Sequence, residues 1–437
     1  MKLKKKIGFI GLGCDKNRVD LERMMSSIND CSFVISNNPD DCDIIVINTC
    51  AFIQSARDET EQTIDEFSIL KEEGKIEKLV VTGCYNELGI KESNLKEKFP
   101  QVDAFVQLKD NAKLPKIIAK LYGEEITCQY GTTSRVLTTP QFAYLKIADG
   151  CNNFCSYCKI PYIRGRYKSE KLSDLIAEAK NLTDKGVTEL ILVAQDVTKY
   201  GSDLNDGSNL IMLLRELSKI KKLKWIRLLY SYPEYITDDL INEIANNTKI
   251  CKYIDIPLQH VSNKILKLMN RRSSKEKIVD LIHKLKKKIP DISIRTTFIV
   301  GFPGETDIEF KEVCDFIRAE NLNNVGFFEF SSEEGTLAHT LKCPVPDRTK
   351  AKRLEKLAAT QYRAVIKNNK KMLGKELEVV VDEVIDGTAI CRSQYQAPFI
   401  DSVIYLENVK DLKPNTYYKV CITEFMDYDF KGELKNE

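Results

Sequence analysis

The sequence has no apolar run long enough to cross a membrane and no N-terminal signal peptide. A membrane-spanning helix needs about 18 or more consecutive apolar residues, and no stretch of the chain approaches that length. Residues 1–6 read MKLKKK and lead directly into a strand-like run, without the apolar region of a signal peptide. We therefore expect a cytoplasmic protein with no membrane partner, whose 43% hydrophobic residues can form a globular core.

A disulfide framework is not expected either, although the chain contains fourteen cysteines. In a long cytoplasmic chain, so many cysteines indicate metal or redox chemistry. Six of them occupy positions with a chemical purpose, which are described below. The other eight are expected to behave as small hydrophobic residues: Cys31, Cys42, Cys128, Cys251, Cys314, Cys343, Cys391 and Cys421.

Three cysteines lie in one short polar turn and can converge without any long-range folding. Cys151, Cys155 and Cys158 have C-x3-C-x2-C spacing and follow a strand-like run at residues 144–148. The next sixty residues contain no cysteine or histidine that could complete a tetrahedral zinc site. Three thiolates on an iron–sulfur cluster would leave one iron open to an outside ligand. An open cluster is favoured, with structural zinc or a non-catalytic redox centre as the alternatives.

The N-terminal region is predicted to contain a small parallel α/β sheet. Continuous apolar runs are typical of strands buried on both faces, and helical patterns separate the three runs found here: residues 7–13, 43–49 and 78–83. A dinucleotide-binding loop is an alternative for the first run. Gly8, Gly11 and Gly13 do not have G-x-G-x-x-G spacing, so that alternative is disfavoured.

Each of these apolar runs is followed by a cysteine. Cys14, Cys50 and Cys84 are spaced 36 and 34 residues apart. Because the carboxyl ends of parallel strands share one edge of a sheet, the three thiols can meet there. A second cluster with an open iron is the natural inference.

The central region alternates strand and helix patterns six times. The predicted strands are residues 144–148, 189–193, 225–230, 253–258, 293–300 and 324–330. Six units cannot close an eight-stranded barrel, so a partial, open (β/α)6 barrel is expected. Polar residues follow the strand ends, at the functional edge of such barrels: Gln195, Asp196, Ser231, Gln259, His260, Glu329 and Ser331.

Two turns of the central region carry further chemical signals. Gly301-Phe302-Pro303-Gly304-Glu305-Thr306 follows the fifth strand and opens a helix. Its glycines allow the backbone to approach a ligand closely, and the helix N-terminus offers free N–H groups. The turn after the cysteine triplet contains two cations, Arg164 and Arg166, beside the expected cluster.

The last 65 residues are predicted to form a small all-β barrel, a shape often used to bind nucleic acid. The expected strands are residues 377–382, 388–392, 402–406 and 417–425. Residues 375–437 contain seven basic and thirteen acidic residues, a net charge of −6. Such a surface should repel RNA and attract a basic partner.

Together these motifs resemble the methylthiotransferase branch of the radical S-adenosylmethionine (SAM) superfamily over essentially the whole chain. The matching segments are GLGCDKNRVDLE, NTCAFIQSARDE, VTGCYNELG, YLKIADGCNNFCSYCKIPYIRGRY, LVAQDVTKYG, RLLYSYP, PLQHVSNKILKLMNRR and FIVGFPGET. The resemblance implies four parts: a flavodoxin-like N-terminal methylthiotransferase domain (1–122), a linker (123–140), a radical SAM barrel (141–372) and a TRAM domain (373–437).

The resemblance also implies roles for particular residues. Two 4Fe-4S clusters are expected: Cys151, Cys155 and Cys158 would hold the one that cleaves SAM, and Cys14, Cys50 and Cys84 an auxiliary one that handles sulfur. Tyr157 is expected near the adenine of SAM. The other candidate SAM-binding residues are Gln195, Gln259, Arg295, Gly301, Gly304 and Glu305.

Some segments point further to a substrate. VAQDVTKYG, PLQH and SSEEGT resemble family members that add a methylthio group to the β-carbon of an aspartate in the small-subunit ribosomal protein number twelve. The alternative is a tRNA adenosine methylthiotransferase of the MiaB type, which the acidic C-terminal region disfavours, so tRNA is not expected as a partner. A reductant protein such as a flavodoxin or a ferredoxin is also implied.

Overall fold

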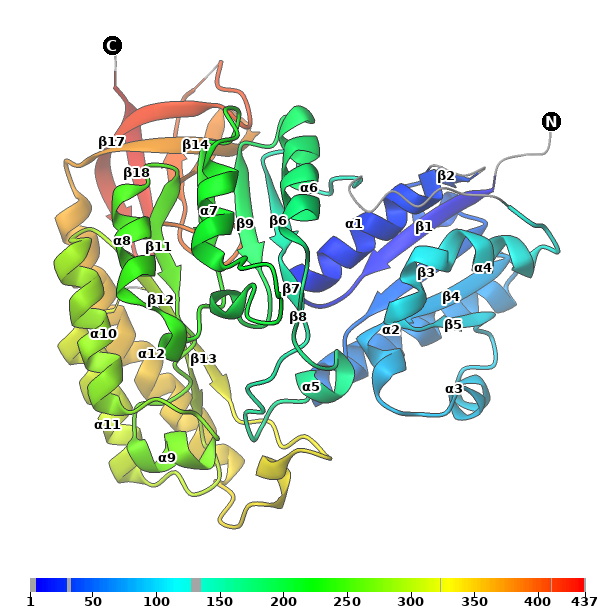
Figure 1. The fold of residues 1–437 in the computed structure, drawn as a ribbon, viewed down its shortest axis with the longest axis horizontal. Coiled ribbons are helices and arrows are strands. Elements are labelled where there is room, and N and C mark those ends of the chain that lie inside the picture. Colours follow the sequence, from blue (N-terminus) through cyan, green and yellow to red (C-terminus); the bar gives the residue numbers. More distant parts are fainter. Residues whose placement is uncertain (1–4, 30–32, 127–134, 323, 410, 436–437) are drawn as a thin grey trace. The chain divides into compact units, whose positions relative to one another are not determined.

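The structure is a computed structural model that describes residues 5–29, 33–126, 135–322, 324–409 and 411–435 (Figure 1). Cys31, Cys128 and residues 127–134 of the expected linker lie outside this part of the chain. Tertiary contacts divide the chain into two compact units, which are described separately. The first comprises residues 1–138, 144–152 and 158–182, and the second comprises residues 139–143, 153–157 and 183–437.

The first unit contains a five-stranded parallel sheet with the order β2-β1-β3-β4-β5. Its strands are β1 (Lys6–Gly11), β2 (Val34–Ile35), β3 (Ile44–Thr49), β4 (Lys78–Gly83) and β5 (Ala104–Val106). Its helices are α1 (Asp15–Asn29), α2 (Gln54–Glu72), α3 (Glu92–Lys98) and α4 (Leu114–Leu121). The three apolar runs form β1, β3 and β4, which confirms the predicted parallel sheet.

Alternate residues of β3 enter different hydrophobic clusters because successive side chains of a strand point to opposite faces. Ile44 and Val46 pack with residues of α1 and α4. Ile45 and Ile47 pack with residues of α2 and α3. All six residues of β3 are buried, as expected for a strand that is covered on both faces.

The first unit also contains a buried arginine held by two carboxylates. The Arg135 side chain has no exposed surface. Its Nη1 donates to Glu178 Oε1 at 2.9 Å and to the Tyr144 carbonyl at 2.5 Å. Its Nε donates to Glu22 Oε2 at 3.1 Å, and Nη2 contacts the same oxygen. Glu22 on α1 and Glu178 on α6 (Leu172–Asp184) are therefore held by one cation.

The central region forms the six-stranded sheet that the sequence predicts. Its order is β13-β12-β11-β10-β9-β6, and the pairs from β9 to β13 are parallel. The strands are β6 (Phe142–Lys146), β9 (Glu189–Val193), β10 (Trp225–Leu228), β11 (Ile250–Asp255), β12 (Ser293–Val300) and β13 (Asn324–Glu329). The helices are α7 (Leu210–Ser218), α8 (Asp238–Asn246), α9 (Asn263–Leu268), α10 (Lys275–Lys288), α11 (Asp307–Glu320) and α12 (Asp347–Asn369).

The chain ends in a closed five-stranded barrel with the order β14-β15-β16-β18-β17 (orange to red in Figure 1). Its strands are β14 (Glu376–Ile385), β15 (Thr388–Ser393), β16 (Ile404–Leu406), β17 (Tyr417–Met426) and β18 (Asp429–Leu434). The parallel pairing of β16 with β18 and the antiparallel pairing of β14 with β17 complete the closure. A core of apolar side chains that includes Val379, Ile404 and Val420 fills the interior.

A buried charge network joins this barrel to the six-stranded sheet. The carboxylate of Glu189 on β9 accepts hydrogen bonds from Arg227 at 2.7 Å and from Arg392 at 2.9 Å. Arg392 lies on β15 and also pairs with Asp382 on β14, at 2.8 Å. Burial opposes ionisation of Glu189, but the two guanidiniums outweigh it and lower its pKa. Both cations therefore keep a charged partner in the interior.

Of the six remaining cysteines that the structure describes, four are buried, as expected, and one is exposed. Cys42, Cys251, Cys314 and Cys391 are buried, and Cys421 is partly buried. Cys343 is exposed, contrary to the prediction. It lies in a turn with a φ of 66°, where the polar loop before α12 leaves its side chain in solvent.

The helix that follows the glycine turn begins with a capping box, and this leads to a prediction. Glu309 Oε2 accepts from the Thr306 N–H at 2.8 Å, while the Thr306 hydroxyl accepts from the Ile308 N–H. Burial opposes ionisation of Glu309, but hydrogen bonds from Thr306 and Lys264 outweigh it and lower its pKa to about 2. Glu309→Gln is expected to destabilise the first turn of α11 by about 1 kcal/mol at pH 7.

The pH dependence of this effect follows from the lowered pKa. The carboxylate stabilises the folded state fully above the ordinary glutamate pKa, and its contribution is lost as the pH falls towards about 2. Hydrogen exchange of residues 301–320 should therefore be about fivefold faster in the variant at pH 7, with the ratio approaching one near pH 2. Asp315→Asn, an exposed change on the same helix, is the control and should leave the exchange rate unchanged. A pH-independent ratio for Glu309→Gln would contradict the assignment.

Candidate metal and cofactor sites

The structure brings Cys14, Cys50 and Cys84 together at one edge of the N-terminal sheet. They follow the carboxyl ends of three adjacent strands, β1, β3 and β4. Gly13 has a φ of 93°, and a Cβ atom at this position would lie 3.1 Å from Cys50 Sγ, so glycine is required for this approach. Burial raises the pKa of Cys84 to about 11, and the thiols of Cys14 and Cys50 are close enough to raise it further.

Asn17 and Arg164 form hydrogen bonds and charge contacts at this edge of the sheet. The Asn17 amide donates to the carbonyls of Leu12 at 3.1 Å and Thr49 at 2.9 Å, which ties the first two loops together. Its Oδ1 accepts from Cys84 Sγ at 3.6 Å and also contacts the Arg164 guanidinium. The sequence places Arg164 beside the other triplet, whereas in the structure its charge acts on Cys84 and lowers the pKa of that thiol.

Two carboxylates fix the Arg164 side chain, which is 1% exposed. Its guanidinium pairs with Asp20 of α1 at 3.1 Å and with Asp149 of β7 (Ala148–Asp149) at 2.8 Å. Because α5 (Ile160–Ile163) ends immediately before Arg164, the segment after the second triplet is anchored to the thiol edge of the first unit. Ile163 adds to this anchor by packing in the same hydrophobic cluster as Cys84.

Hydrogen bonds hold the middle of the C-x3-C-x2-C turn in place. The Ser156 N–H donates to the Met269 carbonyl at 3.0 Å, and its hydroxyl donates to the Leu268 carbonyl at 2.8 Å. The Asn270 amide donates to the Phe154 carbonyl at 2.8 Å. The carboxyl end of α9 therefore acts as a support for residues 153–157.

The loop after β9 also supports this turn. The side-chain amide of Asn153 donates to Asp196 Oδ2 at 3.0 Å. Its Oδ1 accepts a hydrogen bond from the Lys199 ammonium, also at 3.0 Å. Burial raises the pKa of Asp196 above its ordinary value, although the Thr198 and Asn153 hydrogen bonds oppose this. Asp196, which the sequence places in the ring of strand-end polar residues, thus positions the cysteine turn.

Cys155 has two neighbours that the sequence interpretation missed. The Tyr232 hydroxyl lies 3.1 Å from Cys155 Sγ, and Arg271 Nη1 donates to the same sulfur at 3.9 Å. Both residues belong to segments noted for their family resemblance, RLLYSYP and LMNRR. That resemblance was the available signal, but it did not show which side chain reaches a cysteine.

The chemistry of the donors is consistent with iron–sulfur clusters. Each triplet supplies three thiols, the ligands that such clusters use, and Arg271 Nε is a buried donor with no hydrogen-bond partner among the described residues. A buried cationic donor beside a thiol suits an anionic group at that position. Within the described part of the chain, no three His, Cys, Asp or Glu side chains are arranged to hold a metal ion.

The turn at Gly301 and Gly304 has the backbone geometry that the sequence predicts. Both glycines have positive φ, 76° and 86°. The Gly301 N–H donates to Glu305 Oε2 at 3.0 Å, and the same carboxylate pairs with Arg353 at 2.6 Å. His260 Nε2 lies 3.5 Å from Glu305 Oε2. Glu305 therefore holds the turn from inside, because its buried carboxylate is already occupied by these groups.

Three other SAM candidates lie at the carboxyl edge of the six-stranded sheet. Tyr157 packs edge-to-face on Phe302 of the glycine turn, with ring centroids 6.3 Å apart. Gln195 lies two residues after the end of β9 and is partly buried. Gln259 has a φ of 70°, and its backbone pairs with Thr297 and Ile299 of β12. That pairing holds the loop after β11 against the carboxyl-terminal half of β12.

Three family models match the chain. The Radical SAM superfamily matches residues 145–317, the uncharacterized protein family UPF0004 matches residues 6–107, and the TRAM domain matches residues 373–434. Among curated proteins, the ribosomal protein uS12 methylthiotransferase RimO of Clostridium acetobutylicum is 41% identical over 99% of both chains. The chain belongs to the RimO family. The RimO of a Thermoanaerobacter species is 43% identical over 98% of this chain and 100% of the relative.

Membership of the RimO family makes the chain a radical SAM methylthiotransferase, as the sequence predicts. It also implies that the enzyme uses SAM and a 4Fe-4S cluster. Among solved structures, the radical SAM methyltransferase TsrM of Kitasatospora setae has a TM-score of 0.54 at 13% identity, covering 74% of this chain and 73% of TsrM. This likeness concerns the fold, and it confirms the predicted radical SAM architecture.

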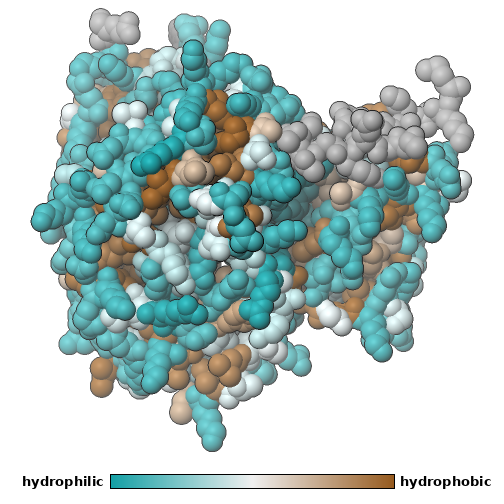
Figure 2. Space-filling model, in the orientation of Figure 1, coloured by the Kyte–Doolittle hydropathy of each residue, from teal (hydrophilic) through white to brown (hydrophobic). Residues whose placement is uncertain are grey.

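No described helix of this RimO-family chain is both long and apolar enough to span a membrane. On the face shown in Figure 2, hydrophilic residues cover most of the surface and hydrophobic residues form smaller patches between them.

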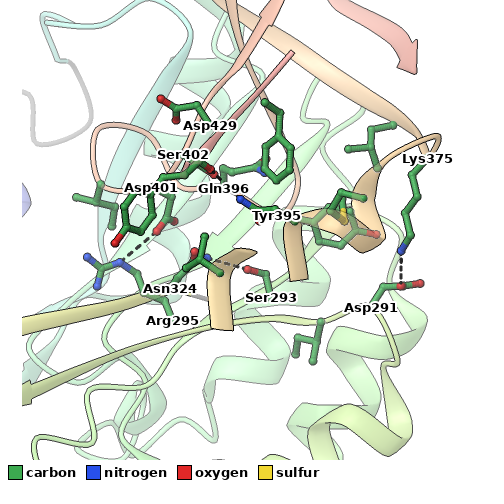
Figure 3. A pocket seen from close by; sticks show the side chains of 18 of the residues that line it. Asp291, Ser293, Arg295, Asn324, Lys375, Tyr395, Gln396, Asp401, Ser402 and Asp429 are labelled. Carbon is green, nitrogen blue, oxygen red and sulfur yellow. Dashed lines mark hydrogen bonds and ion pairs between the residues drawn. The ribbon is translucent and has the colours of Figure 1, made fainter. Parts of the chain in front are cut away.

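Arg295 is the SAM candidate that the structure separates from the others in this RimO-family chain. It is the third residue of β12, roughly 16 Å of extended strand before Val300 and the glycine turn. Its guanidinium lies 3.4 Å from Asp401 and 3.8 Å from Asp255. It lines a cavity of about 580 Å³ near the C-terminal barrel (Figure 3). Its expected contact with SAM stays a prediction.

Proposed function

We propose that this enzyme adds a methylthio group to the β-carbon of an aspartate in ribosomal protein uS12. The observation that carries the proposal is the full-length similarity, 41–43% identity, to curated enzymes named for that activity. The two cysteine triplets support it. The first follows the carboxyl ends of β1, β3 and β4 in a parallel sheet, where ligands bind, and the second lies in the turn after β7.

Two 4Fe-4S clusters and SAM are the proposed cofactors. Cys151, Cys155 and Cys158 would hold the cluster at which SAM binds. Cys14, Cys50 and Cys84 would hold the auxiliary cluster. When bound, these groups supply hydrogen-atom abstraction from an unactivated carbon and the sulfur for the new carbon–sulfur bond.

The chain's own residues position these groups and exclude water. Two hydrogen bonds fix the cysteine turn: Ser156 of the turn donates to the Leu268 carbonyl, and Asn270 donates to the Phe154 carbonyl of the turn. Gly301 and Gly304 let the backbone approach SAM closely, and Glu305 holds their turn rigid through Arg353. Tyr157 would face the adenine. Gln195 and Gln259 would offer amide groups from the neighbouring strand ends.

The charge of the C-terminal barrel favours a protein substrate over tRNA. Residues 375–437 carry a net charge of −6, and a surface that neutralises phosphates should be basic. An acidic surface attracts a basic protein. The proposed substrate partner is therefore uS12, and tRNA is not expected as a partner. A reductant protein such as a flavodoxin or a ferredoxin is the other proposed partner.

A direct test uses the reconstituted enzyme with SAM, a reductant and either uS12 or unmodified tRNA. We expect a mass increase of one methylthio group on an aspartate-containing peptide of uS12, and at least about tenfold less modification of tRNA at equal concentration. A uS12 variant with asparagine in place of the modified aspartate is the matched control and should gain no mass. Modification of tRNA alone would show that the MiaB-type alternative is correct.

A further inference from the structure

Tyr232 and Arg271 form a connected pair around the sulfur of Cys155. Besides contacting the sulfur, the Arg271 guanidinium stacks on the Tyr232 ring at 3.8 Å from its centroid. Arg271 Nη2 also donates to the Pro257 carbonyl at 2.7 Å. The arginine therefore orients the tyrosine, and both groups point at one sulfur atom.

Backbone hydrogen bonds fix the two loops that carry these side chains. Tyr232 ends the short segment after β10, in which the Ser231 N–H donates to the Asp255 carbonyl at 2.8 Å. Arg271 follows α9, and its N–H donates to the Leu266 carbonyl at 2.8 Å. Tyr232 is 6% exposed and Arg271 is 7% exposed. The pair is thus built into the core and is not a mobile surface contact.

Arg271 forms no ion pair with a carboxylate in the described part of the chain. Burial opposes its charge, while Tyr157, Cys155, Tyr232 and, least of these, Glu234 are near enough to raise its pKa. An unpaired buried guanidinium is costly, and its Nε donor is also unsatisfied among the described residues. Thiolates that hold an iron–sulfur cluster are anionic, so a cluster bound through Cys155 would supply the missing negative charge.

We propose that Tyr232 and Arg271 are positioning residues that act through Cys155 to stabilise the reduced form of the SAM cluster. The inference rests on the proposed ligand role of Cys155. A thiolate that binds iron carries no proton, so the Tyr232 hydroxyl is the donor in that state. Hydrogen bonds to the sulfur ligands and nearby positive charge favour the reduced cluster, which carries one more electron.

The test measures the midpoint potential of the SAM cluster in the full-length, reconstituted enzyme by EPR-monitored redox titration. The signal to follow is the one that changes on addition of SAM and is absent from the chain in which Cys151, Cys155 and Cys158 are all replaced by alanine. Tyr232→Phe, which keeps the ring, is expected to lower the ratio of reduced to oxidised cluster by about threefold to tenfold at a fixed potential. Arg271→Met should lower it by about tenfold or more, and tenfold corresponds to about 59 mV for one electron.

Matched controls come from the same two loops. Tyr235→Phe and Arg272→Met make the same two changes at residues for which the described part of the chain shows no hydrogen bond to Cys155. Arg272 Nη1 instead lies 3.5 Å from the Tyr235 hydroxyl. Neither should shift the midpoint potential. The midpoint potential of Arg271→Lys should lie closer to that of the unaltered enzyme than to that of Arg271→Met. The signal of the N-terminal cluster should not move in any variant. If Arg271→Met binds too little iron, Tyr232→Phe and Arg271→Lys decide the question.

Cys155→Ser separates failure of this inference from failure of the proposed function. If Cys155→Ser keeps the SAM-responsive signal, Cys155 is not a ligand and the cluster assignment itself is wrong. If Cys155→Ser loses the signal while Tyr232→Phe and Arg271→Met titrate like the unaltered enzyme, the ligand assignment stands and the role of Tyr232 and Arg271 is refuted.

Discussion

A chain in which Cys151, Cys155 and Cys158 are all replaced by alanine is expected to produce no 5′-deoxyadenosine from SAM. The reason is that these three thiols are the proposed ligands of the cluster that binds SAM, and no other cysteine or histidine follows in the next sixty residues to replace them. Iron per chain should fall from about eight to about four, because one of two four-iron clusters is lost. Mass spectrometry of the nucleoside product and iron analysis measure the two effects.

The reciprocal variant provides the control for this prediction. Replacing Cys14, Cys50 and Cys84 by alanine should also remove about four irons, yet leave SAM cleavage in place and abolish methylthio transfer. Cys343→Ala changes an exposed cysteine outside both triplets and should alter neither iron content nor activity. Loss of all iron from either triple variant would show that the two sites do not assemble independently.

Arg135→Met is expected to destabilise the first unit by about 3–5 kcal/mol. The change leaves the carboxylates of Glu22 and Glu178 buried without their cation, and such broken buried pairs are among the most costly substitutions. Arg23 also pairs with Glu178, at 2.7 Å, so Glu178 keeps one cationic partner. Glu22 is the buried carboxylate that loses its cation, and it accounts for most of the expected destabilisation. Hydrogen exchange of β3 and β4 should accelerate by more than about 100-fold.

The control for Arg135→Met is a surface ion pair. Arg215 pairs with Glu243 at 2.8 Å but has a side chain that is 65% exposed, so Arg215→Met should cost less than about 1 kcal/mol. Each variant is compared with the unaltered protein by amide hydrogen exchange of the unit that carries the substitution. If Arg135→Met and Arg215→Met accelerate exchange by similar factors, the buried network contributes no more stability than a surface ion pair. A second substitution, Glu22→Leu in the Arg135→Met chain, should recover part of the loss by removing the unpaired charge.

The sequence predicts the long elements of the fold and misses the short ones. Continuous apolar runs identify β3, at residues 44–47, and β4, at residues 79–81, because a strand covered on both faces has few polar positions. β2 has two residues and β5 has three, too few for a pattern. β18 reads DFKGEL, and its Gly432 is needed where a Cβ would lie 3.1 Å from the Cys421 carbonyl.

The sequence finds local chemistry more readily than chemistry assembled from distant segments. The C-x3-C-x2-C spacing is visible because its three thiols are eight residues from end to end. Tyr232 and Arg271 are 77 and 116 residues from Cys155 along the chain. Neither is among the polar residues that the sequence predicts at strand ends. The ion pairs of Arg295 with Asp255 and Asp401 also join distant segments, and its expected contact with SAM stays a prediction.

The closure of the C-terminal barrel limits how it can recognise a partner. Every one of its five strands is paired on both sides, so it offers no free row of backbone N–H and C=O groups. An extended peptide cannot bind this barrel by adding a strand to it. Selectivity at this domain must therefore come from side chains and loops, and a few surface substitutions could redirect the enzyme to a different protein without disturbing the fold.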